Sequence, residues 1–135
     1  MRILDTDVCI EILRDNRQVK ARRRSVKDRV VTTWITAGEL YYGAYKSAKP
    51  RENRRLVAEF LRTLDVLGLD TAAVEQFGRL RASLESQGQR LEDADLFIAG
   101  IVLANGGTLV SGNRQHYARI PGLKLEDWIR RAAGP

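Results

Sequence analysis

The stretch that decides the fold class is Arg2-Ile-Leu-Asp-Thr-Asp-Val-Cys-Ile-Glu-Ile-Leu13, because its apolar pattern changes from strand-like to helical within a few residues. The first residues form a short apolar run that stops at Asp5, which predicts a strand. The residues that follow are apolar at helical spacing, at Val8, Cys9, Ile12 and Leu13. A short strand followed at once by a helix is typical of α/β proteins.

The same alternation continues along the chain. Short apolar or β-branched runs predict further strands at 30–33, 66–67 and 108–110. Longer amphipathic stretches, including one from 17 to 29, predict helices between them. Short strands separated by helices pair in parallel and are covered on both faces. The sequence therefore predicts a three-layer α/β/α sandwich with a short-stranded, mainly parallel central sheet, in a single domain over residues 1–135.

The composition narrows the class of protein. The chain has 135 residues, of which 44% are hydrophobic and 30% charged, and this is the balance of a globular protein. Its apolar stretches are well short of the roughly 20 residues that a membrane-spanning helix needs. Acidic residues stand near the N-terminus, where a signal peptide would be apolar. We therefore expect a cytoplasmic protein with no membrane association.

The counts of reactive side chains restrict the chemistry further. Cys9 is the only cysteine and His116 the only histidine. These counts exclude internal disulfides, zinc sites with two or more thiolates, and ribonuclease chemistry that uses one histidine as base and another as acid. We interpret Cys9 as a buried apolar residue and assign no catalytic role to His116. Any hydrolytic chemistry must therefore depend on carboxylates.

Acidic residues and one amide fall at the predicted ends of strands and starts of helices. They are Asp5, Asp7, Glu39, Asp93, Asp95 and Asn113. In an open parallel sheet, ligands bind beyond the carboxyl ends of the strands, where side chains from several loops meet. Like charges brought together there are unfavourable unless a cation neutralises them. Oxygen ligands without paired His or Cys select a hard ion, Mg²⁺ or alternatively Mn²⁺, which supports phosphodiester hydrolysis.

Each of these acids also has a purely structural interpretation. Glu39 could be the far half of a capping box that begins at Thr36. Asp93 and Asp95 stand two residues apart, so on a helix they point in nearly opposite directions. We expect Asp95 to project into the site and Asp93 to cap the helix. The Asp5-Thr-Asp7 motif is a weak signal by itself.

Together these segments resemble the PIN-domain ribonucleases, and in particular the VapC toxins of type II toxin–antitoxin pairs. The matching segments are Ile3-Leu-Asp-Thr-Asp7, Glu39-Leu-Tyr-Tyr-Gly43, Asp95-Leu-Phe-Ile-Ala99, Leu109-Val-Ser-Gly-Asn113 and Ile120-Pro-Gly-Leu123. They occur in the family's order, and the resemblance covers nearly the whole chain.

The resemblance implies a set of site residues. It implies that Asp5, Glu39 and Asp95 bind the metal, with Asp7 and Asp93 as secondary candidates. Its fourth acidic position falls on Asn113, which has one negative charge fewer than the carboxylate of many members and leaves open whether a second metal is held. Ser111 and Thr6 are expected to orient a carboxylate or a water. The resemblance further implies a homodimer, a small cognate antitoxin that blocks the site, and an RNA substrate.

Basic residues form two candidate surfaces for RNA. The chain has 23 Lys and Arg against 17 Asp and Glu, a net charge of +6 that favours a polyanionic partner. The first surface is a predicted helix face with Arg17, Lys20, Arg24 and Lys27, and the second is a cluster that includes Lys46 and Lys49. Either could contact phosphates, and the alternative is an ordinary solvated face.

Two other functions remain open from the sequence. One is a non-catalytic PIN-fold module that binds RNA or protein, for which the neutral Asn113 is an argument. The other is a haloacid-dehalogenase-like phosphatase, whose signature is also Asp-x-Asp after a strand. That signature needs Thr or Val two residues further on, where Cys9 stands. Three tyrosines, Tyr41, Tyr42 and Tyr45, could stack on RNA bases or on apolar residues of an antitoxin, and we favour contacts between helices or between the two copies of a dimer.

Overall fold

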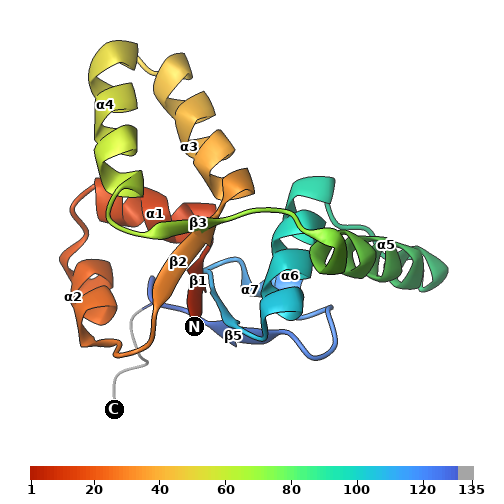
Figure 1. Cartoon of the computed structure of the whole chain (residues 1–135). Coiled ribbons are helices and arrows are strands. Elements are labelled where there is room, and N and C mark those ends of the chain that lie inside the picture. Colours follow the sequence, from red (N-terminus) through yellow and green to blue (C-terminus); the bar gives the residue numbers. More distant parts are fainter. Residues whose placement is uncertain (131–135) are drawn as a thin grey trace.

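The structure, a computed structural model, describes residues 1–130 and is built on a central sheet with helices on both faces (Figure 1). Its strands are β1 (Arg2–Leu4), β2 (Val30–Thr33), β3 (Asp65–Leu67), β4 (Thr108–Val110) and β5 (Lys124–Glu126). Its helices are α1 (Thr6–Leu13), α2 (Arg17–Ser25), α3 (Trp34–Lys46), α4 (Pro50–Leu61), α5 (Thr71–Ser86), α6 (Asp93–Asn105) and α7 (Arg114–Tyr117).

The five strands are all parallel, in the order β3-β2-β1-β4-β5. β1 lies at the centre, with Arg2 opposite Val30 on one side and Thr108 on the other. The predicted parallel sheet is therefore confirmed. Because the strands run in the same direction, the residues that follow β1, β2 and β4 emerge at one edge of the sheet.

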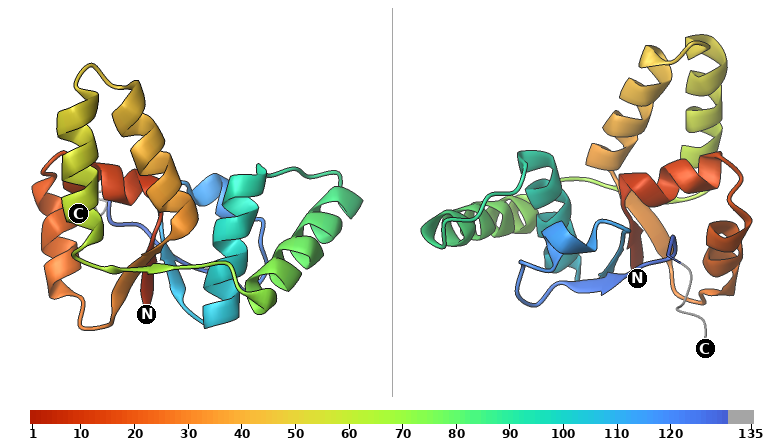
Figure 2. Two further views of the ribbon diagram at one scale, coloured as in Figure 1. Left: turned by 45° about the horizontal axis from the view of Figure 1, so that its top comes forward. Right: turned by 180° about the vertical axis from the view of Figure 1, so that it is seen from behind.

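The alternation of side chains along β1 separates two cores. Ile3 and Leu4 are both fully buried and point to opposite faces of the sheet. Ile3 packs in a cluster with residues of α5, α6 and α7, whereas Leu4 packs in a cluster with residues of α1, α2, α3 and α4. Figure 2 shows α3 and α4 as a hairpin on one side of the sheet and the pair α5 and α6 on the other. The predicted three-layer α/β/α arrangement is confirmed.

The prediction of one helix from 17 to 29 was wrong at its C-terminal end. Helix α2 ends at Ser25, whose hydroxyl donates to the carbonyl of Arg22 (2.8 Å). Val26 is already extended and is partly buried in the second core cluster, because the chain must turn there toward β2. Lys27 therefore lies outside the helix and does not extend the basic face of α2.

The capping-box interpretation of Glu39 was also wrong. Helix α3 begins earlier than expected, and its N-cap is Thr33, whose hydroxyl accepts a hydrogen bond from the Thr36 amide (3.2 Å). Thr36 is buried inside the first turn. The Glu39 side chain is thus free of a capping role and is available to the site.

Two elements near the C-terminal end were not predicted from the sequence. They are the single-turn helix α7 and the edge strand β5, which pairs with β4. The sequence did indicate the end of α6, where Gly106 adopts φ +64°, a left-handed conformation that glycine tolerates well.

Among residues 1–130, no helix is both long and apolar enough to cross a lipid bilayer.

Candidate active site

A pocket of about 450 Å³ lies at the edge of the sheet where β1 and β4 end. Three of the predicted metal ligands line it, Asp5 from the end of β1, Glu39 from α3 and Asp95 from α6. The remaining lining residues are Thr6, Asp7, Ile10, Gly112 and Asn113. Among residues 1–130, no lysine, arginine or histidine lines the pocket, so the described lining is negatively charged.

Asp5 is the most deeply buried acid of this pocket. Its carboxylate accepts hydrogen bonds from the Thr6 amide (2.9 Å) and from the Ser111 hydroxyl (2.7 Å). Burial raises the pKa of Asp5 to about 6, and the charges of Asp7 and Asp95 act in the same direction as burial. The hydrogen bonds oppose this rise without cancelling it. A buried carboxylate with no cationic partner is a group that a metal ion would stabilise.

Glu39 is joined to the start of α1 by a hydroxyl. Thr6 Oγ1 donates to Glu39 Oε1 (2.7 Å) and lies 3.1 Å from Thr36 Oγ1. Thr6 therefore makes a direct contact with a carboxylate, as expected for a residue that orients one. Glu39 is exposed, so it stands at the open side of the pocket while Asp5 lies at its buried side.

Asp95 is half-buried and is held by a residue that sequence reasoning did not identify. The Tyr117 hydroxyl donates to Asp95 Oδ1 (3.3 Å) from helix α7. Burial raises the pKa of Asp95, the hydrogen bond from Tyr117 lowers it, and the charge of Glu92 raises it again. Tyr117 could have been found only by predicting α7, because it stands four residues after Asn113 in that short helix.

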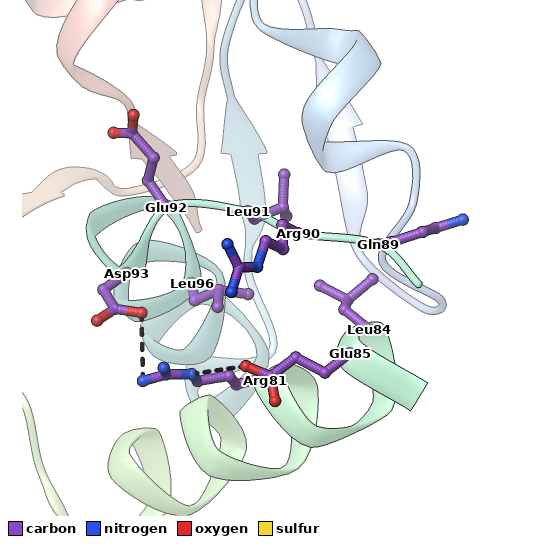
Figure 3. A pocket seen from close by; sticks show the side chains of 9 residues that line it. All are labelled: Arg81, Leu84, Glu85, Gln89, Arg90, Leu91, Glu92, Asp93 and Leu96. Atoms are coloured by element: carbon purple, nitrogen blue, oxygen red, sulfur yellow. Dashed lines mark hydrogen bonds and ion pairs between the residues drawn. The ribbon is translucent and has the colours of Figure 1, made fainter. Parts of the chain in front are cut away.

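Asp93 lies outside the acidic pocket. Figure 3 shows its carboxylate directed toward Arg81 of α5, with which it forms an ion pair (3.6 Å) on the wall of a separate hollow. Arg81 also pairs with Glu85 (3.2 Å). The N-cap of α6 is Glu92, so the expectation that Asp93 caps this helix was wrong. Of this pair of acids, Asp95 lines the acidic pocket and Asp93 does not.

The turn after β4 is tied to the end of β1. Asp7 accepts hydrogen bonds from the Gly112 amide (2.9 Å) and from the Val8 amide (2.8 Å). A side chain at position 112 would crowd Asp7 Oδ2 at 3.0 Å. Ser111 Oγ accepts from the Asn113 amide (3.0 Å), and it also donates to Asp5. Asp7 therefore has a structural task in addition to lining the pocket.

Asn113 presents its amide to the pocket beside the only histidine of the chain. Asn113 Nδ2 lies 2.9 Å from His116 Nδ1, so these groups form a hydrogen bond. His116 also contributes a charge that lowers the pKa of Asp95. We predicted no catalytic role for His116, and the structure places it next to the pocket, although it is not one of the lining residues.

The donor chemistry of the pocket fits a hard divalent cation. Within residues 1–130, no group of three or more His, Cys, Asp or Glu side chains is arranged to hold an ion by itself. A closed cage is not required, because Mg²⁺ is usually held by one or two carboxylates and keeps several waters. A pocket of about 450 Å³ with oxygen donors from Asp5, Glu39 and Asp95 has room for such a hydrated ion.

The predicted RNA-contacting cations lie outside this pocket. Arg17, Lys20 and Arg24 are on α2, where Lys20 pairs with Asp15 (2.6 Å). Lys46 ends α3 and lies over the Tyr42 ring (5.6 Å), and Lys49 precedes α4. These residues stay candidates for contacts remote from the acids.

Comparison with known proteins identifies the family. The PIN domain model matches residues 2–123. A tRNA(fMet)-specific endonuclease VapC from Shigella flexneri is 34% identical over 127 residues, which cover 93% of this chain and 96% of the relative. The chain belongs to the VapC family of PIN-domain ribonucleases. Ribonuclease VapC2 from Haemophilus influenzae is 31% identical over 128 residues, which cover 94% and 97% of the two chains.

Solved VapC-family structures agree with the fold. A DNA-bound VapBC from Salmonella typhimurium matches with a TM-score of 0.89 and 35% identity over 94% of this chain and 97% of the other. A VapBC2 from Rickettsia felis, bound to a DNA fragment of its promoter, also has a TM-score of 0.89, with 28% identity over 94% and 98%. PIN-domain nucleases generally use divalent metal ions, and oxygen donors of the kind that line this pocket suit such ions.

Proposed function

We propose that this VapC-family chain is a Mg²⁺- or Mn²⁺-dependent endoribonuclease and the toxin of a type II toxin–antitoxin pair. One observation carries the proposal: carboxylates from three separate elements converge on one pocket, and in the described part of the chain no basic side chain lines it. Because the chain belongs to a family of ribonucleases, we interpret this pocket as a nuclease active site. The match over residues 2–123 and the single sheet support one nuclease domain in residues 1–135. We further propose that the chain acts in the cytoplasm, where RNA substrates are available.

In this proposal Asp5, Glu39 and Asp95 hold the cation and Asn113 offers a neutral amide to the substrate or the ion. A bound divalent cation lowers the pKa of a water and offsets the charge that builds on the phosphate during in-line displacement. Ser111 keeps Asp5 oriented through its hydroxyl, and Thr6 does the same for Glu39. Metal ligands must be ionised, so the raised pKa of Asp5 makes metal binding depend on pH.

RNA cleavage by the purified chain tests the proposal. Two relatives are named as tRNA(fMet)-specific endonucleases, so initiator tRNA is the first substrate to try, followed by total RNA with end mapping. We expect cleavage with Mg²⁺ or Mn²⁺ and none in excess EDTA. Asp95→Asn should be inactive, whereas Asp93→Asn, a matched change two residues away, should cleave normally because Asp93 pairs with Arg81. Full activity in EDTA would contradict the proposal.

A groove that an antitoxin segment fits lies beside the acidic pocket. A hollow of about 320 Å³ lies between α1, α3 and α4, and Glu39 lines both it and the acidic pocket. Its apolar lining consists of Ile10, Leu13, Leu40, Gly43, Ala44, Leu56 and Val57. Solved relatives are complexes of VapC with VapB, and we propose that an apolar antitoxin segment occupies this groove and reaches the acids. Leu56→Glu should weaken inhibition by the cognate antitoxin without lowering cleavage.

We also propose a homodimer. Trp34, Tyr42 and Tyr45 are the exposed aromatic residues of α3, with 46%, 65% and 63% of their surface accessible. Tyr41 is partly buried against the second core cluster, which accounts for it within one chain. Aromatic residues are enriched at protein interfaces, so the exposed face of α3 supports a contact between copies. Light scattering should give a dimer mass for the wild-type chain and a lower mass for Tyr45→Lys.

A further inference from the structure

Each carboxylate of the proposed metal set accepts a hydrogen bond from one hydroxyl. Ser111 donates to Asp5 (2.7 Å) and Thr6 donates to Glu39 (2.7 Å). Tyr117 completes the set by donating to Asp95 (3.3 Å). The three hydroxyls come from the turn after β4, from α1 and from α7. A neutral donor orients a carboxylate without neutralising it, whereas an arginine or lysine would remove the charge that a cation needs.

The Tyr117 hydroxyl is not needed for packing. The ring is fully buried in the first core cluster, where a phenylalanine would fill the same space. Burying a hydroxyl costs free energy unless it finds a partner, and the partner here is Asp95 Oδ1. A tyrosine hydroxyl is ordinarily protonated near neutral pH, so Tyr117 acts as the donor to the Asp95 carboxylate.

We infer that Tyr117 is a positioning residue that fixes the Asp95 carboxylate for metal binding by holding its Oδ1 oxygen. This inference rests on the proposed function. Among the described residues, Oδ1 is the oxygen of Asp95 that accepts a hydrogen bond, which leaves Oδ2 to a ligand. Partners of this kind typically contribute 10- to 100-fold to metal affinity. The 3.3 Å contact is long for a hydroxyl donor, so we expect an effect at the lower end of that range.

Calorimetric titration of the full chain with Mn²⁺ tests the inference without using activity. Tyr117→Phe should weaken Mn²⁺ binding about tenfold, because the ring is retained and only the hydroxyl is lost. RNA cleavage by this variant should need more metal for half-maximal rate yet reach nearly the wild-type rate at saturating metal. Tyr41→Phe is the matched control, since Tyr41 packs in the other core cluster. Thermal melting should show both variants folded.

A second measurement uses the wild-type sequence, so it does not depend on the variant folding. The chain contains four tyrosines, and ¹⁹F NMR of protein labelled with 3-fluorotyrosine can be assigned from phenylalanine substitutions at 41, 42 and 45. Mg²⁺ should shift the remaining resonance, that of Tyr117, and leave the other three in place.

The outcomes separate the two claims. If the wild-type chain binds Mn²⁺ and Tyr117→Phe binds it equally well or more tightly, the inference is overturned and the proposed function stands. An unchanged Tyr117 resonance on addition of saturating Mg²⁺ would overturn the inference in the same way. If the wild-type chain binds neither Mg²⁺ nor Mn²⁺, both the proposed function and the inference are contradicted.

Discussion

Two carboxylates at the same sheet have opposite surroundings. Glu126 on β5 accepts hydrogen bonds from the Trp128 indole (2.7 Å), from Arg2 (2.9 Å) and from Arg22 (2.8 Å). Burial alone would raise the pKa of Glu126, but these donors outweigh burial and lower it. Asp5, at the end of β1, is more deeply buried, has no basic partner among residues 1–130, and has its pKa raised to about 6.

The difference separates a structural acid from a functional one. The charge of Glu126 is balanced inside the chain, and its contacts tie β5 to β1 and α2. The charge of Asp5 is left unbalanced, which lowers the free energy of unfolding, and the pocket around it contains further acids. A fold keeps such an arrangement where function requires it, because buried charge without a partner is destabilising.

The largest expected effect is on cleavage. Asp5→Asn should lower the rate of RNA cleavage at least as far as the roughly 100-fold that loss of a supporting contact at a metal site can cost. Glu126→Gln is the matched change at the balanced acid and should leave the rate within about twofold of wild type, since Glu126 does not line the pocket. Equal losses in the two variants would remove the distinction between these acids.

The next effect concerns stability without metal. Because the pKa of Asp5 is raised from 3.8 to about 6, the folded chain binds this proton more tightly than the unfolded chain. The free energy of unfolding contributed by Asp5 therefore falls as pH rises from about 4 to about 6. Asp5→Asn should be more stable than wild type by roughly 2 kcal/mol at neutral pH, with little difference at acidic pH.

Urea unfolding in EDTA at pH 7.5 and at pH 3.5 measures this difference. Added Mg²⁺ should stabilise the wild-type chain at pH 7.5 and not the Asp5→Asn chain, because binding to the folded state alone raises its stability. A wild-type chain that is more stable than Asp5→Asn at pH 7.5 in EDTA would show that the Asp5 charge is balanced after all.

A smaller effect is expected at the balanced acid itself. Glu126→Gln should lower the free energy of unfolding by about 1 kcal/mol, because Arg2 and Arg22 lose a charged acceptor but remain partly exposed to water. Mg²⁺ should stabilise this variant as much as wild type. Thermal unfolding with and without Mg²⁺ checks both points, and a variant more stable than wild type would contradict the role given to Glu126.

The smallest effect is expected at Asn113. Asn113→Asp adds a carboxylate to the pocket and should tighten Mn²⁺ binding by up to roughly fivefold, the size of a solvent-exposed charge pair. Calorimetry also reports the number of ions bound, which tests whether a carboxylate at position 113 changes that number. Weaker binding by Asn113→Asp would indicate that the amide serves another purpose.

Much of this molecule could be predicted from its sequence because the signals are local. The apolar runs at β1, β2 and β4 and the acids that follow them are visible in the sequence, and the parallel sheet brings them to one edge. The roles of Ser111 and Thr6 were expected, and both donate to an acid of the pocket.

The features that escaped prediction depend on tertiary contacts. Helix α7 has only one turn, and β5 has a single apolar residue between two charged ones, so neither shows an apolar run or a helical pattern. The contact between Tyr117 and Asp95 spans 22 positions along the chain and forms because the Tyr117 ring is buried in the same core cluster as residues of α6. The early end of α2 is set by Val26 packing in the core, which overrides the helical spacing of the basic residues.

The most direct test of the metal site is anomalous X-ray scattering from crystals of the wild-type chain soaked in Mn²⁺. We expect one strong peak in the acidic pocket, with carboxylate oxygens of Asp5 or Asp95 within about 2.3 Å of it and waters completing the shell. A peak only at exposed acids such as Asp93, or no peak at all with the pocket open to solvent, would contradict the assignment of these carboxylates to a metal.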